Sequence, residues 1–494
     1  MNSAKFFAVP LMAALASCLF PQSACAASFG HFTYSDKGSS ITITGCSQSA
    51  KGALVIPSSI EGKPVTSIRD EAFIGCNQIT AVTIPNSVTH IGGLAFGGCA
   101  ALVRVSIPES IQTIEDSTFD SCPSLSDINI PKSVTSIGDY AFSYCTSLKK
   151  IAIPDSVTSI GAWTFSYCGS LTQISIPGSV VSLGDGVFFY CGNLNSVSLG
   201  NGLTSIGNQA FDSCESLTSI TLPESLKTIG YGAFQTTGLT NVFIPKNVNS
   251  IQRDSFYACA QMSQINVDPL NSFYSSENGV LLNKQKTTII EYPYAKSGSY
   301  EITAGVTRIG DGAFIGCNGL TGVSIPSSVS SIAPGAFLGC DNLTAIRVNT
   351  TNPSYSSDHG VLYDKRKTKL LQFPGGKYGS YTIPNGVVSI EALAFYMCGN
   401  LKSVIIPGSV TSIRRLAFGS CRGLRKAVFL GNAPSLGPSA FVYCAYDFKV
   451  QYLKGKTGFS SPVWHGYPAE AIEPTPEIVA RKPVGSGLGD SGHL

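Results

Sequence analysis

The sequence predicts an α/β repeat solenoid, in which short coils stack so that their strands form one long parallel sheet. Cysteines recur every 23 residues from Cys76 to Cys214, and each follows a phenylalanine by three positions, as in Phe73-x-x-Cys76. A short alternating apolar segment ending in proline recurs with the same period. A fixed period of 20 to 30 residues indicates a stack of coils, because one such unit cannot bury its apolar face alone.

The strand of each coil is clearest in residues 125–147. Ile128 and Ile130 alternate with polar residues, which is the period-2 pattern of a strand with one buried face. Pro131 follows and cannot donate a hydrogen bond to a ladder, so it ends the strand. We therefore expect one strand per coil, stacked at roughly 4.8 Å.

The opposite side of the coil is expected to hold a short helical or 3₁₀ turn. Gly138 fits a turn that needs a positive φ. Ala141, Phe142 and Cys145 lie at positions i, i+1 and i+4, a spacing that one helical turn directs to the same face.

The solenoid is predicted over residues 57–444, with about 14 repeats of 23 residues. Two similar insertions interrupt it, near 269–303 and 350–384. Each carries an apolar run, a charged turn and a second apolar run, which predicts a β-hairpin in place of the ordinary return of one coil. Strands in 27–56 and a segment at 445–472 are expected to cap the two ends.

The N-terminus resembles an export signal. Lys5 precedes an apolar run, and Ala24-Cys25-Ala26 is a cleavage site, so we predict a signal peptide at 1–26. The segment ending in Cys18 also fits a lipobox, which leaves a lipoprotein as the alternative. Because the run is short and no later segment is long enough to span a bilayer, the mature chain is expected to have no transmembrane segment. The protein is then extracellular, cell-surface or periplasmic, and residues 473–494 are expected to be disordered.

Three interpretations of the periodic cysteines compete: buried free thiols, disulfides, and metal or redox chemistry. Export permits disulfides, but side chains in register point the same way, and this chain is large enough to have a core without them. Free cysteine behaves as a small buried hydrophobe. We therefore expect a structural ladder of thiols, formed by Cys76, Cys99, Cys122, Cys145, Cys168, Cys191, Cys214, Cys259, Cys317, Cys340, Cys398, Cys421 and Cys444.

Composition argues against catalysis and nucleic-acid binding. The net charge is +3, charged residues make up 13%, and the five histidines have no metal-ligand spacing. The sequence holds no motif of a nucleophile, zinc site or phosphate loop. We predict a protein that is not an enzyme, with no catalytic, cofactor or metal site.

The motif Ile-Pro-x-Ser-Val-Thr-Ser-Ile-Gly-x-x-Ala-Phe, with its cysteine, is plain in residues 128–142 and nearly so in 404–418. It resembles the BspA-like (Treponema pallidum-type) class of bacterial leucine-rich repeats over residues 54–444. The resemblance implies a curved, right-handed leucine-rich repeat solenoid. It also implies an exported or surface protein that adheres to other molecules and has no catalytic activity.

The leading functional hypothesis is an exported scaffold that binds an extracellular protein or glycan in adhesion or recognition. A structural envelope component that self-associates without a specific ligand is the alternative. One candidate surface is aromatic, and self-stacking that stiffens the edge is its competing interpretation. The other is basic and could equally be a solvated face. The candidate residues are Tyr144, Trp163, Tyr167 and Tyr190 for the first, and Lys365, Arg366, Lys367, Arg414, Arg415, Arg422, Arg425 and Lys426 for the second.

Overall fold

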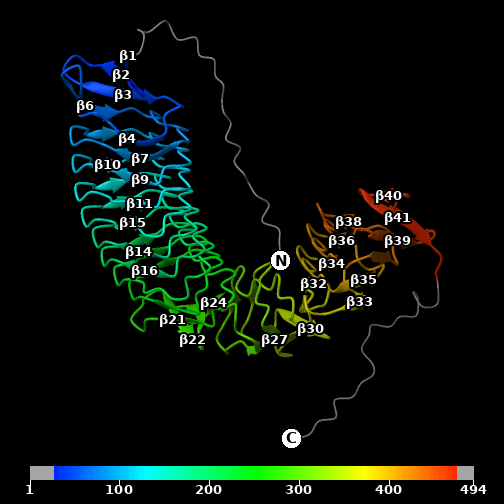
Figure 1. Ribbon diagram of the computed structural model, residues 1–494. Coiled ribbons are helices and arrows are strands. Elements are labelled where there is room, and N and C mark those ends of the chain that lie inside the picture. The colour runs from blue at the N-terminus through cyan, green and yellow to red at the C-terminus, as the bar shows by residue number, and fades with distance from the viewer. Residues whose placement is uncertain (1–26, 475–494) are drawn as a thin grey trace.

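The protein, described here by a computed structural model, is a curved stack of coils over residues 27–474. Figure 1 shows the N-terminal coils in blue and the C-terminal strands in red on two arms that meet through the green and yellow middle of the stack. The expected signal peptide, and all but the first two residues of the expected disordered tail, lie outside the described residues.

The coils form two parallel ladders, where the sequence analysis expected one long sheet, and two coils, those of residues 150–153 and 219–222, have no strand in the first ladder. The first ladder contains the predicted strands, and each residue pairs with its equivalent one repeat later, as Val82 with Val105. It is interrupted in several places: only a single bridge from Lys150 to Gln173 leads from β11 towards β14, and β16 is not paired with β19. The strands of the first ladder are β4 (Gly52–Val55), β7 (Ile79–Thr83), β9 (Arg104–Ser106), β11 (Asp127–Ile128), β14 (Gln173–Ile176), β16 (Ser196–Leu199), β19 (Asn241–Ile244), β21 (Gln264–Val267), β25 (Gly298–Glu301), β27 (Leu320–Ile325), β29 (Ala345–Val348), β33 (Gly379–Thr382), β35 (Leu401–Ile406), β37 (Lys426–Phe429), β39 (Lys449–Leu453) and β41 (Tyr467–Ile472).

The second ladder is made mostly of two-residue strands at the Ser-Ile step of the motif. Ser136 and Ile137 pair with Ser159 and Ile160 of the next coil. Within the described chain this ladder comprises β3 (Ile41–Cys46), β6 (Lys63–Ile68), β8 (His90–Ile91), β10 (Thr113–Ile114), β12 (Ser136–Ile137), β13 (Ser159–Ile160), β15 (Ser182–Leu183), β17 (Ser205–Ile206), β18 (Thr228–Ile229), β20 (Ser250–Ile251), β24 (Thr288–Glu291), β26 (Arg308–Ile309), β28 (Ser331–Ile332), β32 (Lys369–Gln372), β34 (Ser389–Ile390), β36 (Ser412–Ile413) and β38 (Ser435–Leu436).

The expected helical or 3₁₀ turn is wrong, since residues 27–474 contain no helix. In the coil of Phe142, Tyr140 and Tyr144 have φ values of 56° and 57°, which a right-handed helix cannot accommodate. The Phe142 N–H donates to the Thr164 carbonyl of the next coil at 2.9 Å instead of to its own coil. The segment is therefore a series of β-turns tied to the neighbouring coil, and the fold is a β-solenoid.

The core follows the stacked phenylalanine rings. Phe142 and Phe165 have ring centroids 5.5 Å apart and are inclined by 4°, and both side chains are fully buried. The inward isoleucine, valine and leucine residues of every coil pack beside this stack. Stacking of equivalent coils therefore supplies the core that one coil lacks.

Each insertion is a three-stranded antiparallel unit. β22 (Tyr274–Glu277) pairs with β23 (Val280–Asn283), which pairs with β24 across the charged turn that the sequence analysis singled out. β24 then joins the second ladder by pairing in parallel with β26. The second insertion repeats this with β30 (Tyr355–Asp358), β31 (Val361–Asp364) and β32. An insertion thus replaces the return of one coil and restores the ladder.

The insertions also divide the core. Tyr292 takes the phenylalanine position of its coil and packs against Phe314 at 5.1 Å, as Phe373 does against Phe395 at 4.8 Å. The buried apolar residues fall into three clusters, separated at the two insertions. The caps complete the stack with β1 (Ala27–Phe29), β2 (Phe32–Asp36) and β5 (Ser59–Ile60) at one end and β40 (Val463–Trp464) at the other.

Candidate functional site

Tyr144, Tyr167 and Tyr190, here called the tyrosine column, lie two residues after the phenylalanine in three successive coils. The turn of each coil is hydrogen-bonded to the next, with the Tyr144 N–H donating to Ser166 at 2.8 Å. This register stacks the rings with centroids 4.3 Å apart for Tyr144 and Tyr167, and 5.2 Å apart for Tyr167 and Tyr190. The interplanar angles are 8° and 15°. The structure therefore brings the three predicted tyrosines together.

The column occupies a strained backbone position. The φ values of Tyr144, Tyr167 and Tyr190 are 57°, 58° and 59°. A left-handed conformation costs a residue with a side chain about 1–2 kcal/mol. Glycine, which avoids this cost, occupies the same place in four other coils, at Gly75, Gly98, Gly316 and Gly339. The remaining coils hold residues with side chains there, also at positive φ, as at Ser121, Ser213 and Tyr443. The fold itself has no need of tyrosine there, although stacking offsets part of the strain.

Three further aromatic residues widen the column into an aromatic patch. Tyr140 stacks with Trp163 at 6.4 Å, and Phe189 packs edge-on against Trp163 at 5.1 Å and against Tyr167 at 5.5 Å. The aromatic patch consists of Tyr140, Tyr144, Trp163, Tyr167, Phe189 and Tyr190. Sequence reasoning missed Tyr140, although it precedes its phenylalanine by two residues, as Trp163 does in the next coil.

The patch is accessible to a partner. Tyr140, Tyr144 and Tyr190 expose 43%, 46% and 43% of their surface. Burial, together with the charge of the neighbouring Tyr144, raises the pKa of Tyr167 to about 12. At neutral pH Tyr167 therefore carries a neutral hydroxyl group, which can donate a hydrogen bond.

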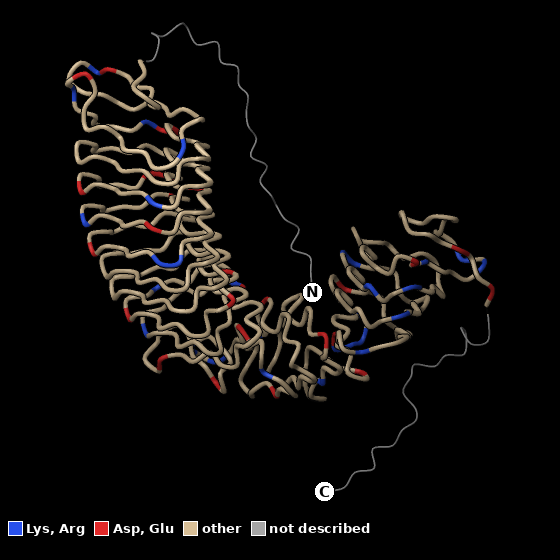
Figure 2. The backbone as a smooth tube through the Cα atoms, in the orientation of Figure 1, with Lys and Arg blue, Asp and Glu red and all other residues tan. Residues whose placement is uncertain are grey.

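The predicted basic residues do not gather in one place. All of them are exposed, and Figure 2 shows Lys and Arg repeatedly along the C-terminal part of the stack. Residues 365–367 lie in the turn before the second ladder, Arg414 and Arg415 follow β36, and residues 422–426 lead into β37.

Two of these basic side chains are also paired. Arg425 contacts Asp447 at 3.1 Å, and Lys367 lies 3.8 Å from Asp358. Because the basic residues occupy three parts of the coil and some are already neutralised, they make a weaker candidate site than the aromatic patch.

The fourteen cysteines of residues 27–474 are all free. The Cys168 thiol donates to the Phe142 carbonyl of the preceding coil at 3.2 Å, and the Cys145 thiol donates likewise to Phe119 at 3.3 Å. Burial raises the pKa of Cys168 to about 12, which keeps it a thiol. Such a group is inert, because the thiolate is the reactive form. The geometry is that of a structural ladder.

Within residues 27–474 no group of three or more His, Cys, Asp or Glu is placed to hold a metal ion. The same part of the chain has no helix of the length and apolarity that crossing a membrane requires.

A family described as the BspA-type leucine-rich repeat region, with six copies, matches residues 66–195, 181–297, 287–359 and 367–454. The chain belongs to the BspA-type leucine-rich repeat family. Leucine-rich repeat proteins of this kind are generally non-enzymatic binding scaffolds, and BspA-type members are typically secreted or at the cell surface. No match is found among curated proteins.

Several solved structures are similar to this BspA-type chain. A leucine-rich repeat protein from Bacteroides ovatus is 25% identical with a TM-score of 0.52, over 90% of this chain and 99% of that one. A leucine-rich cell surface protein from Faecalibacterium prausnitzii is 29% identical with a TM-score of 0.48, over 83% and 96%. The Treponema pallidum leucine-rich repeat protein is 35% identical with a TM-score of 0.36, over 38% and 88%.

Proposed function

We propose that this protein is an exported, non-enzymatic scaffold that binds a protein at the cell surface through the aromatic patch. The observation that carries the proposal is the stacking of three tyrosines in successive coils, of which Tyr144 and Tyr190 are 46% and 43% exposed, with further aromatic rings packed beside them. An exposed cluster of large apolar side chains is a reason to infer an interaction surface. Export rests on the signal sequence at 1–26, and family membership supports a surface location.

The geometry favours a protein partner over a glycan. Sugars bind aromatic side chains through the ring faces, but the faces inside the tyrosine column are covered by neighbouring rings at 4.3 and 5.2 Å. The column presents edges and hydroxyl groups. Tyrosine and tryptophan in this setting are the residue types that dominate protein interfaces, because they bury a large apolar area and keep a hydrogen-bonding tip.

Binding of the mature protein to arrays of purified extracellular proteins and of glycans tests the proposal. We expect at least one protein ligand, whose affinity falls at least 10-fold in Tyr167→Ala and in Tyr190→Gly. Tyr190→Gly is expected to retain its melting temperature, because glycine relieves the φ of 59°.

Tyr443→Gly is the matched control. Tyr443 lies at the same position of its coil with φ 55° and is 72% exposed, but it lies outside the patch. Equal losses in Tyr443→Gly and Tyr190→Gly, or protein binding unaffected by both patch variants, would overturn the proposed site. If the protein bound glycans alone, its ligand would be a glycan and not a protein. Self-association without any ligand would favour a structural role in the envelope.

A further inference from the structure

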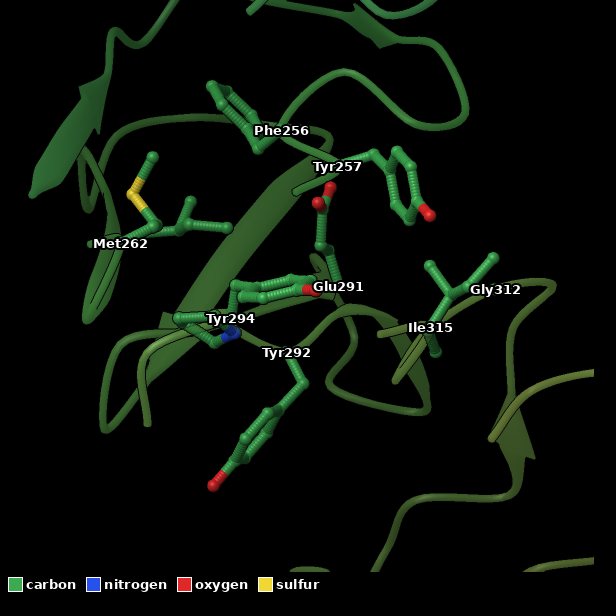
Figure 3. Close-up of a pocket in the computed structure, with 11 residues that line it drawn as sticks. Phe256, Tyr257, Met262, Glu291, Tyr292, Tyr294, Gly312 and Ile315 are labelled. Carbon is green, nitrogen blue, oxygen red and sulfur yellow. The ribbon is translucent and has the colours of Figure 1, made fainter. Parts of the chain in front are cut away.

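A cleft of about 330 Å³ opens beside the first insertion, between the coils of Phe256 and Phe314. Glu291, the last residue of β24, lines it and also lines a narrower adjoining cavity of about 10 Å³. Figure 3 shows the Glu291 side chain extending among Phe256, Tyr257 and Ile315. A carboxyl group thus lies where two hollows of the surface meet.

Among residues 27–474, no neighbouring group stabilises the ionised form of this carboxyl group. Burial is the largest influence on Glu291 and the charge of Asp254 is the next, and together they raise its pKa to about 8. No hydrogen-bond donor contributes to this shift. A desolvated carboxyl without donors stays protonated at neutral pH unless another molecule supplies them.

In the second insertion, the side chain at the position equivalent to Glu291 has hydrogen-bond partners. Gln372 is the equivalent of Glu291, and its Nε2 donates to the carbonyls of Phe373 at 3.1 Å and Ala394 at 3.5 Å. The equivalent carbonyls beside Glu291 belong to Tyr292 and Ala313. Where Gln372 has an amide N–H that donates to such carbonyls, ionised Glu291 has carboxyl oxygens, which accept hydrogen bonds and so cannot pair with carbonyls. A ligand that complements this site is therefore one that brings N–H donors.

The rim of the cleft adds negative charge. Arg253 contacts Asp311 at 3.1 Å and Asp254 at 3.5 Å, so its charge is already engaged. Two carboxylates share this one guanidinium, and Asp254 is only 18% exposed. At the second insertion the equivalent positions hold the uncharged residues Pro334, Gly335 and Ala392. The two rim carboxylates of Asp254 and Asp311 are therefore particular to the first insertion, whereas the second cleft has its acidic residue, Glu391, at a different position.

The walls suit a cation as well. Tyr257 and Tyr294 line the narrow cavity beside Glu291, and aromatic rings attract a cation placed over their faces. At the second insertion the equivalents are Leu338 and Gly375, which have no ring.

We propose that the cleft beside Glu291 binds a primary ammonium group, carried either by a small amine or by a lysine side chain. Glu291 and Asp254 accept the N–H donors, and the tyrosines pack against the aliphatic carbons. Binding draws the proton from Glu291, because the carboxylate forms only when a cation compensates its charge. At neutral pH one proton is therefore released for each ammonium bound.

Isothermal titration calorimetry at pH 7 with n-butylammonium chloride, in two buffers of different ionisation enthalpy, tests the inference. We expect saturable binding with a proton release approaching one per site. Glu291→Gln should weaken binding at least 10-fold and abolish the proton release. This variant is expected to fold, because Gln372 occupies the same place in the second insertion. The other titratable groups facing Glu291 are Asp254, Arg253, Asp311, Tyr257, Tyr292, Tyr294, Cys259 and Cys317.

Glu391→Gln is the matched control, since Glu391 lines the second cleft but accepts a hydrogen bond from the Ser389 hydroxyl at 2.8 Å. It should bind n-butylammonium as the unaltered protein does. Tetramethylammonium, which has no N–H donor, should bind at least 10-fold more weakly. A short peptide with one lysine, blocked at both ends, separates the two sources of the group: tighter binding than n-butylammonium indicates a protein lysine, and weaker binding indicates a free amine.

Three results would overturn the proposal. The first is no saturable binding of n-butylammonium to the intact protein. The second is equal affinity for tetramethylammonium, which would mean that N–H donation is irrelevant. The third is unchanged affinity in Glu291→Gln.

Discussion

At the scale of single residues, the structure explains why cysteine recurs. From Cys99 onward, each thiol of the ladder donates to the carbonyl of the aromatic residue in the preceding coil, as Cys421 does to Phe395 at 2.8 Å. Cysteine is small enough to lie between stacked rings and still carries a donor. The sequence predicts that these thiols are buried, but the acceptor is 26 residues away and becomes apparent only once coils are in register.

The thiol contact leads to a prediction at Cys168. Cys168→Ala should destabilise the fold by about 1–2 kcal/mol, because it leaves a small cavity and removes a donor from the Phe142 carbonyl. Thermal and urea unfolding measure this loss. Cys444→Ala is the control, since its thiol makes the same contact with Phe418 at 3.4 Å from a partly exposed place, and its loss should be less than half as large. Equal losses would contradict the explanation.

At the scale of elements, the insertions are held by a buried amide. Asn271 is fully buried, and its Nδ2 donates to the carbonyls of Pro245 and Val248, both at 2.8 Å. Its Oδ1 accepts the N–H groups of Phe273 and Tyr274, also at 2.8 Å. Asn352 makes the equivalent four contacts in the second insertion. These bonds fasten the start of each insertion to the coil before it.

Asn271→Asp should therefore destabilise the first insertion strongly. A carboxylate keeps the two acceptor contacts but turns its other oxygen towards two carbonyls, and an unpaired buried charge costs about 3 kcal/mol or more. Hydrogen exchange of β22 and β23 should rise accordingly. Asn283→Asp is the matched control, because Asp364 already occupies its place in the second insertion and accepts from the Lys369 N–H at 2.7 Å. Comparable exchange in both variants would refute the anchoring role.

The tyrosines of the inserted strands β22 and β30 also fasten each insertion to the preceding coil, by accepting hydrogen bonds from strands of the second ladder. The Ile251 N–H of β20 donates to the Tyr274 hydroxyl at 2.9 Å, and the Ile332 N–H of β28 donates to the Tyr355 hydroxyl at 3.0 Å. The similarity of the two insertions predicts that they share a structure. The sequence does not predict that the Asn and Tyr of the shared motif satisfy groups of the preceding coil, because those partners are 23 or more residues away.

At the scale of the whole molecule, buried carboxyl groups set the pH dependence of stability. Burial raises the pKa of Asp212 to about 6 and that of Glu291 to about 8, and it also raises the pKa of Asp120. The folded state therefore binds more protons than the unfolded state above the ordinary carboxyl pKa. Stability should fall as pH rises from about 5 to about 8, by up to ~1.4 kcal/mol per pH unit for each group.

Melting temperatures measured across this range check the prediction. Glu291→Gln should flatten the decline between about pH 5 and 8, because glutamine has no proton to lose, whereas Glu391→Gln should leave it unchanged. A melting temperature that rises from pH 5 to pH 8 would contradict the assignment of Glu291 as a protonated, partly buried acid.

The sequence by itself determined the repeat, the strand before the proline in most coils, the buried phenylalanines and cysteines and the duplication of the insertions. These features depend on local spacing and on the alternation of apolar residues, which the chain displays directly. The tertiary structure decided whether the turns are helical, because the Phe142 N–H donates its hydrogen bond to a carbonyl in the next coil and not to one in its own turn. It also decided the second ladder, the inclusion of Tyr140 in the aromatic patch and the cleft at Glu291. Each of these depends on side chains or backbone groups that the coils bring together from about 20 or more residues away, where sequence spacing gives no guide.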